Sequence, residues 1–275
     1  MTDLTGQTAV VTGAGRGIGR EIARHLAAAG ARVALAARSA DQLEAAAEEI
    51  RGAGGQALPM TADVTDVDEV AALVERVEDE LGAVDLLVNN AGSFYVLGPL
   101  WKADPERWWT DVTINLRGPF LGCRAVLPGM IRRGRGRIIN LIGGGTGTPF
   151  AYGSGYGSSK AAVMRLTECV AEELRSAGSP VAVFALGPGL VRTTLTEYQL
   201  HSPEGKQWMP RIEKLFAEGR DVPPTRAAAL AVELAGGRFD RLAGRTFSVG
   251  DDLEELLARQ DEIIRKDQKT LRFRT

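Results

Sequence analysis

The chain has 275 residues, of which 44% are hydrophobic and 25% charged, and its formal net charge at pH 7 is −2. This length suits one well-buried domain rather than two, and the composition is that of an ordinary globular protein. The near-neutral charge, without a dominant basic block, excludes nucleic acid as an expected partner. No apolar stretch of about 18 residues and no signal-peptide pattern occurs, so we expect no membrane partner and a cytoplasmic location. The two cysteines and two histidines lack metal-ligand spacing, and no metal site is expected.

Short apolar segments alternate with helix-like segments along the chain. Strands are predicted at residues 9–12, 33–37, 57–60, 86–89, 137–141, 181–185 and 246–249. Helices are predicted between them at residues 18–29, 40–52, 66–81, 104–133, 158–177 and 225–236. Strands that alternate with helices in this way form a parallel sheet covered on both faces. We therefore predict an α/β fold, a single-domain doubly wound parallel sheet of the Rossmann-like type, over residues 1–250.

Two segments interrupt the alternation. Residues 194–223 form a connection longer than most loops between strands and helices, which indicates either a substrate-binding loop or a packed surface excursion. Residues 251–275 continue past the last predicted strand as a C-terminal helical extension of the same domain. Within it, apolar residues recur on roughly one helix face at Leu253, Leu256, Leu257, Ile263 and Ile264. That apolar stripe requires a cover, which is either the domain itself or a neighbouring subunit.

A glycine-rich turn follows the first predicted strand. Residues 12–19 read Thr-Gly-Ala-Gly-Arg-Gly-Ile-Gly, and a helix-like stretch begins directly after them. Glycines in such a turn let backbone N–H groups approach a pyrophosphate, and the helix N-terminus adds partial positive charge. Alone, this spacing is compatible with a dinucleotide site and equally with an ordinary tight turn.

Five further motifs follow the turn. They are Asp63-Val64, Asn89-Asn90-Ala91-Gly92, Asn115, Tyr156-x-x-x-Lys160, and Pro188-Gly189 with Val191 and Thr193. Together with the glycine turn, they resemble the short-chain dehydrogenase/reductase family over roughly residues 5–250, in the family's order. Each motif alone is weak evidence for the family, whereas six motifs in the family's order are strong evidence for it. The resemblance implies an NAD(P)-dependent oxidoreductase.

The resemblance also implies where the cofactor lies. The second strand ends at Ala37, where an Asp or Glu would bind the adenosine ribose and repel a 2′-phosphate. The next residue, Arg38, is a solvated loop cation or a ligand of that phosphate, and Arg16 in the turn can add a second guanidinium. Because the acidic residue is missing, we expect NADP(H), with NAD(H) as the runner-up. The expected cofactor-binding residues are Gly13, Arg16, Gly17, Ile18, Gly19, Arg38, Asp63, Val64, Asn90, Ala91, Gly92, Tyr156, Lys160, Pro188, Gly189, Val191 and Thr193.

The Tyr-x-x-x-Lys pair carries the expected chemistry. Lys160 lies one helical turn after Tyr156 on the same face, and its positive charge would lower the pKa of the phenol. The resemblance implies that Tyr156 is the acid/base, that Lys160 also binds the nicotinamide ribose, and that Asn115 anchors a water leading to the lysine.

One member of the family pattern is missing. The family serine, whose hydroxyl polarises the substrate carbonyl, would stand where this chain has Gly143. Loss of one such donor typically lowers the rate about 10²- to 10³-fold. Thr146, Thr148 or Ser154 can supply a substitute hydroxyl. We expect Ser154 to be the catalytic one, because it is tied to the helix that carries Tyr156.

These residues predict an oxidoreductase that transfers a hydride between NADP(H) and a small-molecule carbonyl/alcohol substrate. Loop aromatics favour an apolar or ring-containing substrate, unless they only pack on one another; they are Phe94, Tyr95, Phe150, Tyr152, Tyr198 and Trp208. Two alternatives are a cofactor-using isomerase or dehydratase on the same scaffold, and a non-catalytic NAD(P)-binding protein. The apolar stripe and the family's usual assemblies predict a homodimer or homotetramer.

Overall fold

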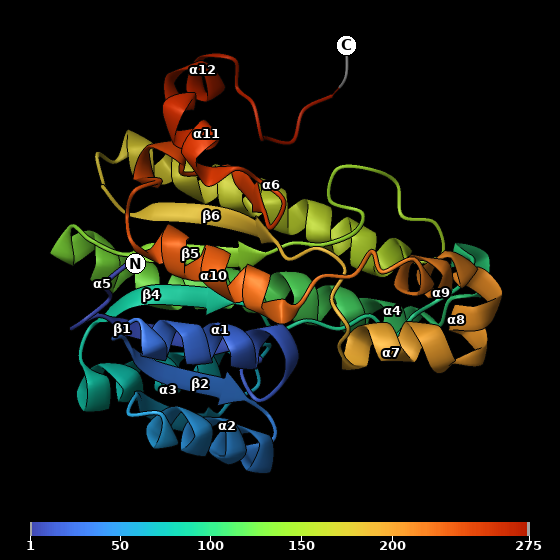
Figure 1. Cartoon of the computed structure of the whole chain (residues 1–275), viewed down its shortest axis with the longest axis horizontal. Coiled ribbons are helices and arrows are strands. Elements are labelled where there is room, and N and C mark those ends of the chain that lie inside the picture. Colours follow the sequence, from blue (N-terminus) through green and yellow to red (C-terminus); the bar gives the residue numbers. More distant parts are fainter. Residues whose placement is uncertain (1, 274–275) are drawn as a thin grey trace.

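Seven parallel strands form one sheet in the computed structural model, which describes residues 2–273. The strand order is β3-β2-β1-β4-β5-β6-β7, with helices on both faces (Figure 1). The strands are β1 (Thr8–Thr12), β2 (Arg32–Ala37), β3 (Gln56–Thr61), β4 (Val84–Asn89), β5 (Arg137–Leu141), β6 (Ala182–Gly187) and β7 (Thr246–Ser248). Each of the seven lies within two residues of its predicted bounds. The predicted doubly wound Rossmann-like fold is confirmed.

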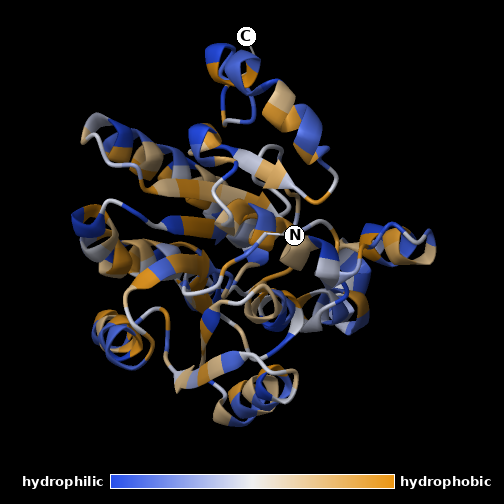
Figure 2. Cartoon of the chain, turned by 60° about the vertical axis from the view of Figure 1, so that its left-hand side comes forward, coloured by the Kyte–Doolittle hydropathy of each residue, from blue (hydrophilic) through white to orange (hydrophobic). Residues whose placement is uncertain are grey.

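Two layers of helices cover the sheet. One face packs against α1 (Gly17–Ala28), α2 (Ala40–Gly52) and α10 (Pro224–Ala235), and the other against α3 (Val67–Leu81), α5 (Gly118–Arg133) and α6 (Ser154–Ser176). Neighbouring residues of β1 show why the strands are apolar throughout, since Val10 and Val11 are fully buried in opposite core clusters. Figure 2 shows the same pattern, with apolar residues concentrated in the strands and polar residues on the helices' outer faces.

The helix predicted over residues 104–133 is interrupted. A short 3-10 turn, η1 (Leu100–Lys102), precedes α4 (Pro105–Val112), and the π-helical η2 (Thr113–Arg117) separates α4 from α5. Single π-helical turns inside α-helices are frequent at functional sites. Here the irregular turn contains Asn115, whose side chain is fully buried.

The segment expected as a long loop folds into three short helices. These are α7 (Thr194–His201), α8 (Pro203–Trp208) and α9 (Pro210–Ala217), and they lie beyond the carboxyl ends of the strands (Figure 1). The hydroxyls of Thr193 and Ser202 cap α7 and α8, and a proline begins α8 and α9. The prediction missed these helices because each is too short to show an apolar periodicity.

The C-terminal extension packs on its own domain. It contains α11 (Leu253–Ala258) and α12 (Gln260–Arg265), and follows the short η3 (Asp240–Leu242) and β7. Ile263 is 1% exposed within the same core cluster as α1 and α10, and Leu253, Leu256 and Leu257 pack against that cluster. The domain itself therefore covers much of the apolar stripe, and the homo-oligomer stays a prediction. Within residues 2–273, no helix combines the length and hydropathy that a membrane span requires.

Candidate functional site

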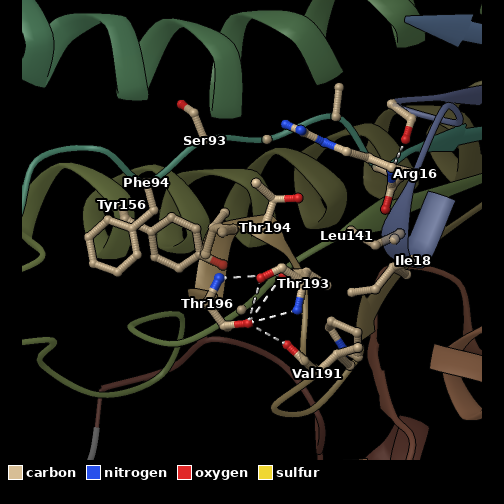
Figure 3. Close-up of a pocket in the computed structure, with 18 of the residues that line it drawn as sticks. Arg16, Ile18, Ser93, Phe94, Leu141, Tyr156, Val191, Thr193, Thr194 and Thr196 are labelled. Carbon is tan, nitrogen blue, oxygen red and sulfur yellow. Dashed lines mark hydrogen bonds between the residues drawn. The ribbon is translucent and has the colours of Figure 1, made fainter. Parts of the chain in front are cut away.

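A cleft of about 1260 Å³ opens at the carboxyl ends of the strands, where ligands bind in open α/β sheets. Most of the residues expected from the sequence line it, and Figure 3 shows several of them with their side chains. Three expected residues, Gly19, Asn115 and Ser154, do not line the cleft. Those that do are Gly13, Arg16, Gly17, Ile18, Arg38, Asp63, Val64, Asn90, Ala91, Gly92, Tyr156, Lys160, Pro188, Gly189, Val191 and Thr193.

The glycine turn is shaped by close backbone approaches. Gly13 has φ +64°, and a Cβ there would lie 2.9 Å from the Cα of Ala91. A Cβ on Gly19 would overlap the carbonyl of Gly13 and the amide of Asn90. The Asn90 amide fixes the turn by donating from Nδ2 to the carbonyl of Thr12 at 2.8 Å. Only glycine fits these positions, so the turn presents backbone to the cleft at the N-terminus of α1, as phosphate binding requires.

Two arginines and one carboxylate line the part of the cleft beside the end of β2, where the resemblance expects the adenosine. Arg16 and Arg38 are both exposed and line it, and Ala37 stands where a ribose-binding acid would repel a phosphate. Asp63 is the nearby acidic residue, and hydrogen bonds from Thr65 hold the pKa of its carboxyl below the usual range, with a smaller contribution from the charge of Arg38. The two guanidinium groups therefore outnumber the one carboxylate in this part of the cleft.

Tyr156 and Lys160 lie together on α6, as the sequence predicts. Lys160 is 5% exposed, its Nζ donates to the carbonyl of Leu141 at 2.9 Å, and it lies 5.6 Å from the centroid of the Tyr156 ring. Burial raises the pKa of Tyr156 to about 12 and lowers that of Lys160 to about 8. Without a ligand, the cost of burying a phenolate therefore exceeds the effect of the lysine charge, and Tyr156 is protonated at neutral pH.

The Tyr156 hydroxyl occupies the space that a side chain at position 143 would need. A Cβ on Gly143 would overlap Oη and would lie 3.1 Å from Cζ of the tyrosine. Contacts of 3.0–3.4 Å are already tighter than nine in ten real Cβ contacts. Gly143, where the resemblance expects a serine, thus leaves room for the tyrosine hydroxyl beside the end of β5.

None of the expected substitute hydroxyls lines the cleft. Ser154 Oγ accepts a hydrogen bond from Trp108 Nε1 at 3.0 Å, and Thr146 Oγ1 donates to the Gly143 carbonyl at 2.8 Å. Thr148 is exposed outside the cleft. The expectation that Ser154 polarises the substrate carbonyl stays a prediction, and the structure gives it no support, because Ser154 does not line the cleft and its Oγ is hydrogen-bonded to Trp108.

A buried network that the sequence did not reveal holds the loop after β4. Asn115 binds both backbone groups of Ser93, accepting from N at 3.0 Å and donating to O at 2.8 Å. Asp111, which is fully buried, accepts from Ser93 Oγ at 2.6 Å and from the backbone N–H groups of Tyr95 and Val96 at 2.9 and 3.0 Å. Asn115 therefore positions this loop, and its expected water stays a prediction. No sequence motif identifies Asp111, because its role depends on hydrogen bonds with the loop after β4, which is separate from it in the sequence.

Aromatic side chains form one wall of the cleft beside Tyr156. The ring of Phe94 stacks on that of Tyr156, with centroids 4.6 Å apart and planes 18° apart (Figure 3). Phe150 and Tyr95 also line the cleft. Tyr152, Tyr198 and Trp208 do not line the cleft. Tyr152 packs against Trp208, and Tyr198 packs against Tyr95.

The segment after β6 closes the other side of the cleft. The backbone N–H of Thr193 donates to Thr196 Oγ1 at 2.8 Å, and Thr196 Oγ1 donates to the carbonyl of Val191 at 2.9 Å (Figure 3). The Thr193 hydroxyl caps α7 through the backbone N–H of Thr196. This hydroxyl is where the resemblance expects a donor to the nicotinamide amide, so α7 begins at the expected cofactor site.

Comparisons with known proteins agree with this geometry. The family model for short chain dehydrogenases matches residues 7–203. A short chain dehydrogenase of Pseudocercospora fijiensis is 42% identical over 194 residues, 70% of this chain but only 62% of that protein, so the match spans less than two thirds of that relative. A 3-oxoacyl-[acyl-carrier-protein] reductase of Synechocystis is 40% identical over 252 residues, 90% of this chain and 97% of that protein. A crystal structure of an actinorhodin polyketide ketoreductase with NADPH has a TM-score of 0.80 and 34% identity, covering 88% of this chain and 95% of that one.

Proposed function

The chain belongs to the short-chain dehydrogenase/reductase family of NAD(P)-dependent oxidoreductases, and we propose that it uses NADPH to reduce the carbonyl group of an apolar, ring-containing ketone. The observation that carries the proposal is the position of the Tyr156 hydroxyl, which lines the cleft at the end of β5. Its pKa of about 12 keeps the phenol protonated at neutral pH, as a proton donor to a carbonyl oxygen must be.

The residues around the cleft fit NADPH. The backbone of the glycine turn would receive the pyrophosphate, because neither Gly13 nor Gly19 leaves room for a side chain. Arg16 and Arg38 would bind the 2′-phosphate, with no carboxylate at position 37 to oppose it. The similar ketoreductase structure holds NADPH, which supports the same preference here. When bound, the cofactor supplies the hydride.

The residues around the reacting carbonyl then have separate tasks. Tyr156 donates the phenolic proton to the substrate oxygen, which receives it as the carbonyl becomes an alcohol. Lys160 stabilises the tyrosinate that remains and binds the nicotinamide ribose, while Asn115 holds the loop beside the tyrosine. Since none of the substitute hydroxyls lines the cleft, Tyr156 polarises the carbonyl without a serine partner.

The aromatic wall supports the substrate class. Phe94 and Phe150 flank Tyr156, and Ile212 and Leu215 of α9 line the cleft as well. Such surfaces favour an apolar or aromatic ring over a small sugar-like substrate, which would need paired hydrogen-bonding groups.

The test is steady-state oxidation of NADPH with a panel of cyclic and aromatic ketones, followed by the absorbance of the cofactor. We expect turnover by the wild-type protein and none above a few per cent by Tyr156→Phe, with an unchanged Kd for NADPH. Binding of NADPH without turnover of any ketone would favour the non-catalytic NAD(P)-binding alternative. Isomerised or dehydrated product without net cofactor oxidation would favour the isomerase or dehydratase.

A further inference from the structure

One side-chain amide in the wall of the cleft has no hydrogen-bonding partner among residues 2–273. Four polar side chains both line the cleft and are less than 9% exposed: Ser93, Lys160, Thr196 and Gln199. The first three donate to groups of the protein at 2.6–2.9 Å. The carboxamide of Gln199, which is 4% exposed, makes no hydrogen bond with any residue in the described range 2–273.

The position of Gln199 on α7 directs it toward the catalytic side of the cleft. It follows Leu195 by one helical turn, and residues four apart share a helix face. Both residues line the cleft, and Leu195 packs in the apolar cluster that contains Phe94 and the ring of Tyr156. The amide therefore stands in the wall that a substrate bound beside Tyr156 would touch.

The carboxamide of Gln199 is open to the cleft. Its Oε1 and Nε2 are not among the described side-chain atoms that are both closed off from water and unpaired, so they remain accessible although the side chain as a whole is 4% exposed. Polar groups placed in this way in the wall of a ligand pocket fix the orientation of the ligand and provide specificity. The side chains of Phe150, Ile212 and Leu215, which also line the cleft, offer no hydrogen-bonding group. A ligand can supply one.

We propose that Gln199 is a specificity-determining residue that hydrogen-bonds an oxygen substituent on the ring system of the ketone, distinct from the carbonyl that Tyr156 protonates. The substrate class is thus an oxygenated ring ketone, which carries a second hydroxyl or carbonyl group. A carboxamide suits either group, since its Oε1 accepts from a hydroxyl and its Nε2 donates to a carbonyl. This inference rests on the proposed function for its reacting group.

A kinetic comparison tests the pairing. The probes are α-tetralone and a set of its ring-hydroxylated derivatives, assayed with NADPH on the wild type and on Gln199→Leu, which keeps a similar volume. The wild type should prefer at least one hydroxylated ketone, and Gln199→Leu should lower that preference in kcat/KM about tenfold to a hundredfold. No preference in the wild type, or a preference that the variant retains, would overturn the inference. A parallel loss of NADPH affinity in the variant would also overturn it, because the amide would then serve the cofactor.

Thermal unfolding of the ligand-free protein tests the same residue without any turnover. Because the Gln199 carboxamide has no partner among the described residues and is open to the cleft, Gln199→Leu should leave Tm within about 2 °C of the wild type. The matched control is Thr196→Val on the same helix, which removes a hydroxyl with partners and should lower Tm. If Gln199→Leu lowers Tm as much as Thr196→Val does, the amide has a structural partner and the inference is wrong. If the wild type reduces no ketone while Gln199→Leu leaves Tm unchanged, the proposed function fails, and the inference fails with it for lack of a reacting group.

Discussion

Restoring the family serine at position 143 should damage this protein. The ring of Tyr156 cannot move aside freely, because it stacks on Phe94 at 4.6 Å and Phe94 is itself 1% exposed. A Cβ at Gly143 overlaps the phenolic oxygen, so Gly143→Ser must displace either the hydroxyl or the end of β5. Overpacking of this kind costs about 1–3 kcal/mol, and a misplacement of about 1 Å in a reacting group costs about 10²-fold in rate.

The assay compares kcat/KM for ketone reduction and Tm in Gly143→Ser with those in a matched variant, Gly147→Ser. Gly147 lies in the same loop and has nothing within 4 Å of a Cβ, so that control should match the wild type in both measurements. Gly143→Ser should lose about 10²-fold in kcat/KM and several degrees in Tm. Activity at or above the wild-type level in Gly143→Ser would refute the reasoning, because the tyrosine would then accommodate a serine partner.

Three further outcomes are expected. Ala37→Asp should weaken NADPH binding relative to NADH about tenfold, because the new carboxylate repels the 2′-phosphate; equal Kd values for the two cofactors in the wild type would contradict the site's charge argument. Asp111→Ala leaves the hydroxyl of Ser93 and the backbone N–H groups of Tyr95 and Val96 without their acceptor, so it should lower the free energy of unfolding by about 2–4 kcal/mol and reduce kcat, with partial recovery in Asp111→Asn. Burial lowers the pKa of Lys160 from 10.5 to about 8, so between these values the unfolded chain binds more protons than the folded one. The stability of the ligand-free wild type relative to Lys160→Met should therefore rise as pH increases from about 8 to 10, and a flat difference would contradict the burial of the ammonium.

Much of the fold could be predicted from the sequence because its signals are local. An apolar strand such as β1, buried on both faces, reads as an uninterrupted apolar run, and the glycine turn after it has steric causes that a motif records. The order of the motifs also placed Tyr156 and Lys160 together on α6. The prediction missed helices α7 to α9 because each has at most eight residues, too few to show an apolar periodicity.

The parts of the site that sequence could not supply depend on contacts between distant residues. Ser154 lies two residues before Tyr156, yet it does not line the cleft, and its Oγ accepts a hydrogen bond from Trp108, 46 residues earlier. The roles of Asp111 and Gln199 are likewise set by what surrounds them after folding, one with several donors and the other with none. The pKa of Tyr156 also depends on the folded structure. Burial of the phenol raises it, and the neighbouring lysine does not reverse that shift.

The most direct test of the central claim is a single turnover with the preformed NADPH complex. Wild-type protein, Tyr156→Phe and Ser154→Ala are each saturated with NADPH, mixed with α-tetralone or a hydroxylated derivative, and followed by the loss of cofactor absorbance. If Tyr156 alone supplies the proton, Ser154→Ala loses absorbance at the wild-type rate and Tyr156→Phe stays at its starting value while still binding NADPH. Turnover by Tyr156→Phe, or a large loss of rate in Ser154→Ala, would contradict the account.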